Sequence, residues 1–397
     1  MKAPFLGVLV LLGALFGSSV AWAQAPDQIP GQAVIEEAQG SYIFVFDPEQ
    51  VGPSDVPSLA QGLAQEHGAG LRHTFTHALQ GFSANISPAG AARLAENNPL
   101  IQYYEPNGVI WAVDQPTSNP NRIQGEAPPG SGGGGPTTPE PPQVIPYGIS
   151  RVGGFQDVSG LGFNVWVIDS GIDLDHPDLN VGSGVSFISA RGKKTADDGN
   201  GHGTHVAGTI AAIDNDIDVV GVAAGAVVHP VRVLDNSNMG TIDGAVKGVD
   251  WVMANASPGD CANMSLSASG HWESLHTAVL NAADSGIRFT LAAGNNGYDA
   301  NNREPAHVNH ANVYTVSAIN SSDVFASFSN WGNPPVDFAA PGVSVLSTQM
   351  GGGVTTKSGT SMAAPHVCGV LTLVNTPGQD GNATGDPDGN PDPIVHK

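Results

Sequence analysis

Apolar and polar positions along the chain follow two patterns, and the change between them falls near residue 145. Within residues 41–112, alternating apolar stretches and helical stretches predict a small α+β unit. Its strands are expected at residues 42–46, 82–86 and 101–111, and its helices at residues 59–67 and 88–97. About seventy residues give such a unit only a marginal core of its own.

From residue 145 to residue 374, apolar strands alternate with helices, the pattern typical of a parallel sheet with crossover helices. Strands are expected at residues 164–168, 227–234, 262–266, 286–292 and 313–319. Helices are expected at residues 202–213, 243–253, 272–283 and 361–374. Reactive groups in such sheets gather at the carboxyl ends of the strands, and the polar motifs of this chain fall there.

The remaining segments differ from both units in composition. Residues 1–23 carry Lys2, an apolar run and a small residue at Ala23, which predicts a cleaved signal peptide and a secreted, extracellular protein. The apolar run is shorter than the ~20 residues that cross a bilayer. Residues 113–143 are rich in Pro and Gly and predict an exposed linker and processing region. Residues 375–397 form a polar tail.

Charge and cysteine content narrow the possible partners. The chain has 14 Lys and Arg against 36 Asp and Glu, a net charge of −22. Attraction to nucleic acid or to an anionic membrane is therefore disfavoured, and neither is expected as a partner. Two cysteines make no disulfide framework for a chain of this size. The pattern favours Cys261 and Cys368 as buried apolar side chains over a disulfide between them.

Two polar motifs stand at the end of a strand and at the start of a helix. Asp169 directly follows an apolar strand, where it is either a turn residue or a desolvated acid. His202 opens a helix between Gly201 and Gly203, and His205 follows it by three positions. A zinc peptidase helix has two His four apart with a Glu between them, so the spacing disfavours zinc.

Two further motifs lie later in the chain. Ser361 starts the last strong helix, where backbone N–H groups favour developing negative charge. Asn295 follows a buried strand and could donate to an oxyanion or only close a turn. Each motif alone is compatible with a helix cap or a turn, but the order Asp, His, Asn, Ser matches one known catalytic arrangement.

The longer blocks around these residues carry a family resemblance. Residues 198–208, 232–235 and 328–332 resemble blocks of the subtilisin-like serine peptidases, most closely the proteinase K branch, and the likeness runs from about residue 145 to residue 374. It implies an α/β fold, the subtilisin-like three-layer fold with a mainly parallel sheet, preceded by a small α+β propeptide domain. His205 and His366 are expected to be structural.

The resemblance also implies catalytic roles. Asp169 would orient His202, and His202 would take the proton of Ser361 and return it to the leaving amine. Ser361 would attack the peptide carbonyl and form an acyl-enzyme. Asn295 and the backbone N–H of Ser361 would hold the oxyanion.

Substrate is expected to lie extended between two backbone segments and against a pocket wall. By resemblance these substrate-binding residues are Asn238, Met239 and Gly240; Ser265, Leu266 and Ser267; and Ala292, Ala293 and Gly294. The family commonly has Gly where this chain has Ser267, whose side chain would narrow the pocket or shift the substrate. A preference for apolar or aromatic residues is expected.

Residues 41–112 resemble the family propeptide through a motif at residues 81–84, and an unrelated accessory domain is the alternative. The propeptide would act as the enzyme's own inhibitor, and the processing site would fall between Trp111 and Gln143. No cofactor is expected for the chemistry. Asp337, with the carbonyls of Ala311 and Val313, matches a family calcium site, so a structural calcium ion is expected there unless Asp337 is a plain surface residue. Oxygen groups in residues 386–392 could bind a second ion.

The resulting hypothesis is a secreted, monomeric serine endopeptidase that acts on polypeptide substrates and is made as an autoprocessed precursor. One alternative is a narrow-specificity processing protease, which would need an acid in its pocket to read dibasic sites. Another is a secreted binding protein that keeps the fold without the activity. All four catalytic positions are filled, which favours the enzyme.

Overall fold

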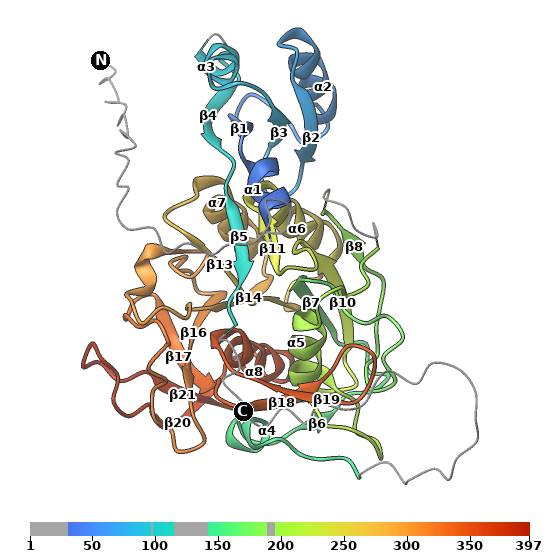
Figure 1. Ribbon diagram of the computed structural model, residues 1–397, viewed down its shortest axis with the longest axis vertical. Helices are drawn as coiled ribbons and strands as arrows, with labels where there is room; N and C mark the ends of the chain where they lie inside the picture. The colour runs from blue at the N-terminus through green and yellow to red at the C-terminus, as the bar shows by residue number, and fades with distance from the viewer. Residues whose placement is uncertain (1–30, 97, 115–141, 189–194) are drawn as a thin grey trace, which may run out of the picture.

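The computed structural model describes residues 31–96, 98–114, 142–188 and 195–397. Two bodies are stacked along the long axis of the molecule, the small one formed by the N-terminal residues and the large one by the rest (Figure 1). The predicted signal peptide and most of the predicted linker lie outside the described residues. Among the described helices, none combines the length and apolar character of a membrane span.

The small body is an antiparallel sheet with order β2-β3-β1-β4, covered on its outer face by two helices. Its elements are α1 (Gln32–Ala38), β1 (Ser41–Phe46), α2 (Val56–Glu66), β2 (Gly70–Phe75), β3 (Gly81–Asn85), α3 (Pro88–Glu96) and β4 (Ile101–Pro106). Because alternate strand residues point to opposite faces, Phe44 and Phe46 pack with α2 and α3. Ile43 and Val45 face the large body.

A nine-stranded sheet forms the centre of the large body, in the order β20-β21-β17-β16-β14-β12-β7-β10-β8. Its strands are β7 (Asn164–Asp169), β8 (Val185–Ser186), β10 (Val227–Arg232), β12 (Cys261–Met264), β14 (Arg288–Ala292), β16 (Val313–Ile319), β17 (Val336–Pro341), β20 (Gly378–Asn382) and β21 (Pro393–His396). All neighbouring pairs are parallel except β20 and β21.

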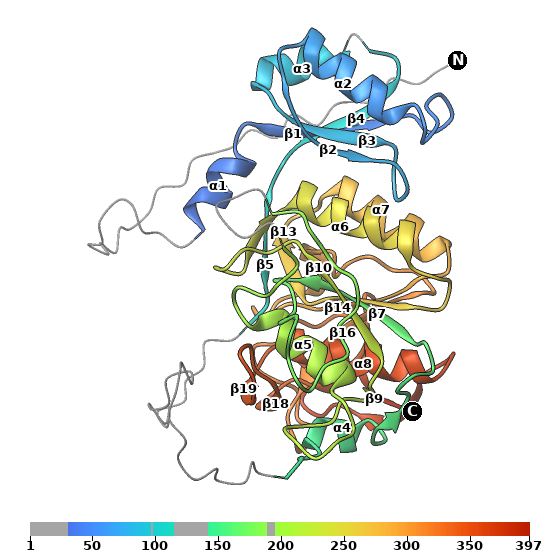
Figure 2. The ribbon, with the colours of Figure 1, turned by 90° about the vertical axis from the view of Figure 1, so that its right-hand side faces the viewer.

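Helices cover both faces of this sheet, which makes three layers and confirms the expected α/β class (Figure 2). On one side lie α5 (His202–Ala211) and α8 (Thr360–Leu373). On the other side lie α6 (Ile242–Asn255) and α7 (Glu273–Asp284), on which the small body rests. Short elements complete the large body: α4 (Tyr147–Arg151), β6 (Gln156–Asp157), β9 (Ala223–Ala224), η1 (Ala300–Asn302), β18 (Val345–Thr348) and β19 (Val354–Lys357).

The strand expected at residues 101–111 is two strands. β4 belongs to the small body, whereas β5 (Val109–Ala112) enters the large body and lies in a second sheet of order β11-β5-β13-β15. The other strands of that sheet are β11 (Met239–Thr241), β13 (Leu266–Ser269) and β15 (Arg303–Glu304). The apolar pattern is continuous because both strands are partly buried, so it does not reveal that they have different partners.

The C-terminal residues are more ordered than their composition suggested. The segment described as a polar tail forms β20 and β21, and Ile394 pairs with Ala339 at the edge of the main sheet. Ala383 and Ile394 are buried with Phe325 in a small cluster. A few apolar side chains at suitable spacing are therefore enough to extend the sheet despite the surrounding Pro, Gly and Asp.

The sequence-based preference for two unpaired cysteines is wrong. Cys261 at the start of β12 and Cys368 in α8 form a disulfide, with their Cα atoms 5.8 Å apart. Both residues are fully buried, as expected. The bond forms because α8 packs directly across β12, a proximity that sequence spacing does not reveal.

Candidate active site

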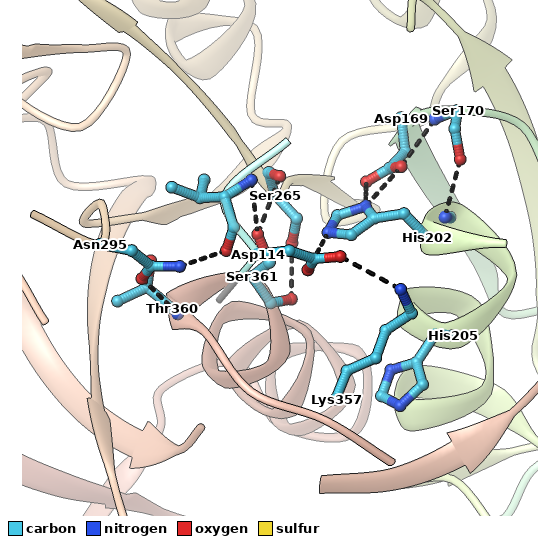
Figure 3. Close-up of polar contacts among 12 residues, drawn as sticks. Asp114, Asp169, Ser170, His202, His205, Ser265, Asn295, Lys357, Thr360 and Ser361 are labelled. Atoms are coloured by element: carbon cyan, nitrogen blue, oxygen red, sulfur yellow. Dashed lines mark hydrogen bonds and ion pairs between the residues drawn. The ribbon is translucent and has the colours of Figure 1, made fainter. Parts of the chain in front are cut away.

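Asp169 lies at the carboxyl end of β7 and is completely buried. Its Oδ1 and Oδ2 atoms are 2.7 and 2.9 Å from Nδ1 of His202 (Figure 3). Oδ1 also accepts a hydrogen bond of 2.6 Å from the backbone N–H of Ser170. The carboxylate is thereby fixed in a position that orients the imidazole.

His202 is the first residue of α5, and a second buried acid shapes the loop before it. Gly201 has a φ of 95°, a left-handed conformation that favours glycine. Oδ1 of Asp198 accepts hydrogen bonds from the backbone N–H of Gly201 and from Oγ of Ser170. Its Oδ2 accepts from the N–H and the hydroxyl of Thr204. The block at residues 198–208 therefore positions His202 relative to Asp169.

Ser361 is the second residue of α8 and is completely buried. Its Oγ donates to the carbonyl oxygen of Ser265 at 3.0 Å and accepts from the backbone N–H of Val113 at 3.2 Å. In return, Oγ of Ser265 donates to the carbonyl of Ser361 at 2.8 Å. The hydroxyl proton of Ser361 is directed to Ser265 and not to His202.

Asn295 follows β14, and its side-chain amide is held in one orientation. Its Oδ1 accepts hydrogen bonds of 2.9 Å from both the backbone N–H and the hydroxyl of Thr360. Nδ2 consequently faces the opposite direction and donates to the carbonyl oxygen of Val113 (Figure 3). Sequence reasoning did not identify the role of Thr360 in orienting the Asn295 amide, although its place directly before Ser361 was a usable signal.

Strand β5 fills the groove between β11 and β13. Trp111 is paired antiparallel with Met239 on one side and with Ser267 on the other. The backbone N–H of Ala112 donates to the carbonyl of Asn238 at 3.0 Å. The structure thus brings the two expected backbone segments, 238–240 and 265–267, to either side of one extended strand of the chain itself.

Asp114 follows directly and contacts His202. Its Oδ1 lies 3.0 Å from Nε2 of His202, and its Oδ2 lies 3.1 Å from Nζ of Lys357 (Figure 3). Sequence reasoning singled out neither Asp114 nor Lys357, because no local pattern marks them.

These carboxylates control the charge of His202. Burial lowers the pKa of the imidazole, but the carboxylates of Asp114 and Asp169 outweigh burial and raise the pKa to about 10. Burial raises the pKa of Asp114. His202 and Lys357 lower it by a larger amount, so the pKa of Asp114 lies below its usual range. His202 is therefore an imidazolium held between two carboxylates.

The expected pocket wall lies at the end of β14. Ala292 and Ala293 are completely buried, and Gly294 has a φ of 109°. Asn330, from the block at residues 328–332, donates through Nδ2 to the carbonyl of Ala293 at 2.9 Å and through its backbone N–H to that of Gly294 at 2.9 Å. The block at residues 328–332 therefore supports the pocket wall and takes no part in the contacts among Asp169, His202 and Ser361 described above.

The other two histidines of the motifs are buried away from the catalytic contacts. Nε2 of His205 lies 3.1 Å from the carbonyl oxygen of Val345, and burial lowers the pKa of this ring to about 3. Nδ1 of His366 lies 2.8 Å from the carbonyl oxygen of Met362, and burial lowers its pKa to about 4. Both rings are neutral and bonded to the backbone.

The carboxylates considered for calcium have protein partners. Asp337 lies on β17 and accepts a hydrogen bond of 2.9 Å from the backbone N–H of Thr315, and burial raises its pKa to about 6. Asp392 is fully buried and accepts from Asn333 at 2.8 Å, and burial raises its pKa to about 6 as well. Oδ1 of Asp386 accepts from the N–H of Asp388.

Comparison with known proteins agrees with this geometry. The model of the subtilase family matches residues 160–383. Subtilisin E of Bacillus subtilis (strain 168) is 42% identical over 237 residues, which are 58% of this chain and 61% of that protein. M-protease of Shouchella clausii (strain KSM-K16) is 33% identical over 392 residues, which are 94% of this chain and 89% of that protein. The crystal structure of a cold-adapted subtilisin-like serine proteinase is similar with a TM-score of 0.56 and 37% identity, over 63% of this chain and 97% of that one.

This chain belongs to the subtilase family. Its three layers and mainly parallel sheet are the subtilisin-like fold. The match to subtilisin E spans less than two thirds of that protein's length.

Proposed function

We propose that this protein is a secreted serine endopeptidase, made as a self-inhibited precursor that cleaves its own Val113–Asp114 peptide bond and then other polypeptides. One observation carries the proposal. The carbonyl oxygen of Val113 accepts a hydrogen bond from Asn295, while the Val113 N–H donates to the hydroxyl of Ser361. An extended segment paired on both sides is the usual mode of peptide recognition along a strand edge.

In this mechanism Oγ of Ser361 attacks the carbonyl carbon of Val113 as His202 accepts the hydroxyl proton through Nε2. The Ser361 hydroxyl must first turn from the Ser265 carbonyl to His202, and the Asp114 carboxylate must move away from Nε2.

Negative charge then develops on the Val113 oxygen, where Asn295 and the backbone N–H of Ser361 stabilise it. His202 donates its proton to the amide nitrogen of Asp114, and the C–N bond breaks. The acyl-enzyme that remains on Ser361 is hydrolysed by water, activated by the same imidazole.

The small body is proposed to be the inhibitor. Its contact with the large body is centred on Asp243 of α6, which is completely buried. The carboxylate accepts hydrogen bonds from Arg72 at 2.7 Å, Ser83 at 2.7 Å and Asn107 at 2.8 Å, all from the small body. Separating the two bodies would break these three hydrogen bonds, so the small body should stay docked after the peptide bond is cut.

The segment in the groove also bears on specificity. Residues 109–113 read Val-Ile-Trp-Ala-Val, and Ile110 is completely buried among side chains of the large body. A groove occupied by apolar side chains favours apolar substrates over dibasic ones, and therefore a broad endopeptidase over a dibasic processing protease. Ser267 is buried and paired with Trp111 of this segment.

The proposal keeps three expectations from the sequence. Residues 1–23 direct export, the enzyme acts as a monomer, and a structural calcium ion at Asp337 adds stability but takes no part in the chemistry. The four groups Asp169, His202, Ser361 and Asn295 suffice for acyl transfer without a cofactor.

The decisive experiment compares the full chain with its Ser361→Ala and Ser321→Ala variants, Ser321 being an exposed serine far from the groove in sequence. The parent and Ser321→Ala should yield a product whose N-terminus is Asp114 and which hydrolyses casein, with phenylmethylsulfonyl fluoride abolishing the hydrolysis. Ser361→Ala should remain uncut and inactive. A parent that is cut yet leaves casein intact would favour the narrow-specificity or inactive alternatives. Cleavage of Ser361→Ala at the same bond would refute self-processing.

A further inference from the structure

A second group of titratable side chains lies outside the active site, at the far end of β13. It comprises His271 before α7, His276 on α7, Glu304 at the end of β15 and His307 in the turn that follows. One nitrogen or oxygen atom from each of these residues lies within 4.8 Å of those of all the others. We call this set the His-Glu cluster.

Glu304 is buried with one backbone donor and three imidazole rings around its carboxyl group. Its side chain is completely buried, and among the described residues its Oε1 atom has no hydrogen-bond partner. Oε2 accepts a long hydrogen bond of 3.4 Å from the backbone N–H of Trp272 and lies 3.2 Å from Nδ1 of His307 and 3.6 Å from Nδ1 of His271. A buried carboxylate is costly unless a cation or several donors face it.

The three imidazoles are crowded around this carboxylate. Nδ1 of His271 lies 2.7 Å from Nε2 of His307, and the rings of His276 and His307 are stacked with centroids 4.7 Å apart. Nδ1 of His276 is buried without a hydrogen-bond partner among the described residues and lies 3.9 Å from Oε1 of Glu304.

The outer nitrogens of two of these rings already have the partners that metal-bound histidines have. Nε2 of His271 lies 2.9 Å from a carboxylate oxygen of Glu273, and Nδ1 of His307 lies 3.0 Å from the carbonyl oxygen of Arg303 and 3.2 Å from Oε2 of Glu304. In metalloproteins such contacts orient the ring so that the other nitrogen faces the ion. The inner nitrogens, Nδ1 of His271 and Nε2 of His307, face each other.

We propose that His271, His276, His307 and Glu304 form a binding site for one divalent transition-metal ion of the zinc class. Three imidazole nitrogens and one carboxylate are ligands that Zn²⁺ accepts in tetrahedral geometry, whereas Ca²⁺ prefers oxygen ligands throughout. Ligand atoms around tetrahedral zinc are about 3.4 Å apart, so the side chains need only small rotations to close around the ion. His271 is half-exposed, which leaves a route for the ion to enter.

A bound ion would stabilise β13, the strand that pairs with the segment in the groove. Glu304 is paired with Ala268 on β13, and the same strand pairs with Ala112 through Leu266. His276 belongs to α7, so one ion would join α7 to the edge of the β13–β15 pair. We therefore expect the metal to stabilise the groove and not to take part in acyl transfer.

The test uses an untagged full chain carrying Ser361→Ala, so that self-digestion does not interfere. The protein is stripped with a transition-metal chelator while excess Ca²⁺ is present, then equilibrated with Zn²⁺ or Co²⁺. Metal content is measured by mass spectrometry, coordination by the visible absorption of Co²⁺, and stability by thermal unfolding. Glu304→Gln and His276→Ala are the test variants, and His310→Ala is the control because that ring pairs with Asp284 outside the cluster.

The expected result is one ion per chain in the parent and in His310→Ala, with the intense Co²⁺ absorption of a tetrahedral site. At a free Zn²⁺ concentration 100 times its Kd, the ion should shift the folding equilibrium about 100-fold towards the folded state. Both test variants should lose the ion and this shift. Glu304→Gln preserves side-chain size, and circular dichroism will show that it is folded. A folded parent that binds no more metal than His276→Ala would overturn the proposal.

Discussion

Oδ1 of Asp114 lies 3.0 Å from Nε2 of His202, the ring nitrogen opposite the one that contacts Asp169. Asp114, the residue that follows the proposed cleavage site, thus contacts the nitrogen atom through which His202 would accept a proton. With a pKa of about 10, roughly one His202 ring in a thousand is neutral at pH 7. In the proposed precursor, the Asp114 contact would restrain His202 by charge, in addition to the strand that fills the groove.

Replacing Asp114 by Asn should accelerate self-processing at neutral pH. The Asp114 carboxylate raises the pKa of His202, so its removal lowers that pKa and increases the fraction of neutral base at pH 7. The gain should be about tenfold for each unit by which the pKa falls. The measurement is the rate of precursor loss between pH 6 and pH 11, a range of about five units that spans both protonation states of His202. The rise in rate with pH should occur at lower pH in Asp114→Asn than in the parent. Asp214→Asn, at an exposed acid, is the control. An unchanged pH profile in Asp114→Asn would contradict the role given to this contact.

Replacing Asn295 by Ala should abolish most of the activity without unfolding the protein. Its amide is the side-chain donor to the Val113 carbonyl oxygen, and loss of one oxyanion donor costs about 3 to 4 kcal/mol in the transition state, or roughly 10² to 10³ in kcat. Steady-state hydrolysis of a peptide substrate will measure this. KM should change little, because the donor acts mainly on the transition state.

Thr360→Val gives a second variant at the same site, one that leaves the Asn295 amide in place. It removes the hydroxyl that donates to Oδ1 of Asn295 and accepts from the backbone N–H of Gly294, and kcat should fall less than in Asn295→Ala. Equal losses in both variants would indicate that the orientation of the amide matters as much as its presence.

Removing the disulfide should destabilise the large body. The bond between Cys261 and Cys368 closes a loop with a sequence separation of 107. Loss of such a cross-link costs about 2 to 5 kcal/mol. Urea unfolding of Ser361→Ala, with and without Cys261→Ala and Cys368→Ala together, will measure the difference. Equal midpoints and slopes would show that the bond is dispensable for stability.

Replacing Arg72 by Met should release the small body after processing. Nε of Arg72 contacts Asp243 at 2.7 Å, and without it a buried carboxylate loses its cationic partner. Breaking a buried pair in this way costs about 3 to 5 kcal/mol. In the parent, size-exclusion chromatography should show the cleaved N-terminal fragment eluting with the large body, and in Arg72→Met the two should separate. Arg93→Met, at an exposed position of α3 on the outer side of the small body, should behave like the parent.

The positive groups around Asp243 set the pH dependence of this contact. Burial raises the pKa of Asp243, but His73 and Arg72 lower it more, so it lies below the usual value for Asp. A depressed pKa means that the free carboxylate binds protons more readily than the docked one. The contribution of Asp243 to docking should therefore be complete above its usual pKa and be lost as the pH falls below it. Fragment dissociation should increase under acid conditions, and Asp243→Asn should reduce that dependence.

The sequence by itself determined the architecture and the identity of the groups in the active site. A buried strand ending in Asp169, a helix opening at His202 and a helix opening at Ser361 are local patterns, because strand and helix periodicity are properties of neighbouring residues. The resemblance of the blocks around them supplied an expected role for each, and the fold that it implied is the fold observed.

The tertiary structure alone decided how distant segments meet. Val113 reaches Ser361, 248 positions along the chain, because β4 and β5 pair in different sheets, and apolar periodicity does not specify a strand's partner. The disulfide, the contact of Asp114 with His202 and the packing of the last strands were hidden for the same reason. The His-Glu cluster joins residues from α7, β15 and their flanking turns. Such arrangements depend on distances in space, which no spacing along the chain encodes.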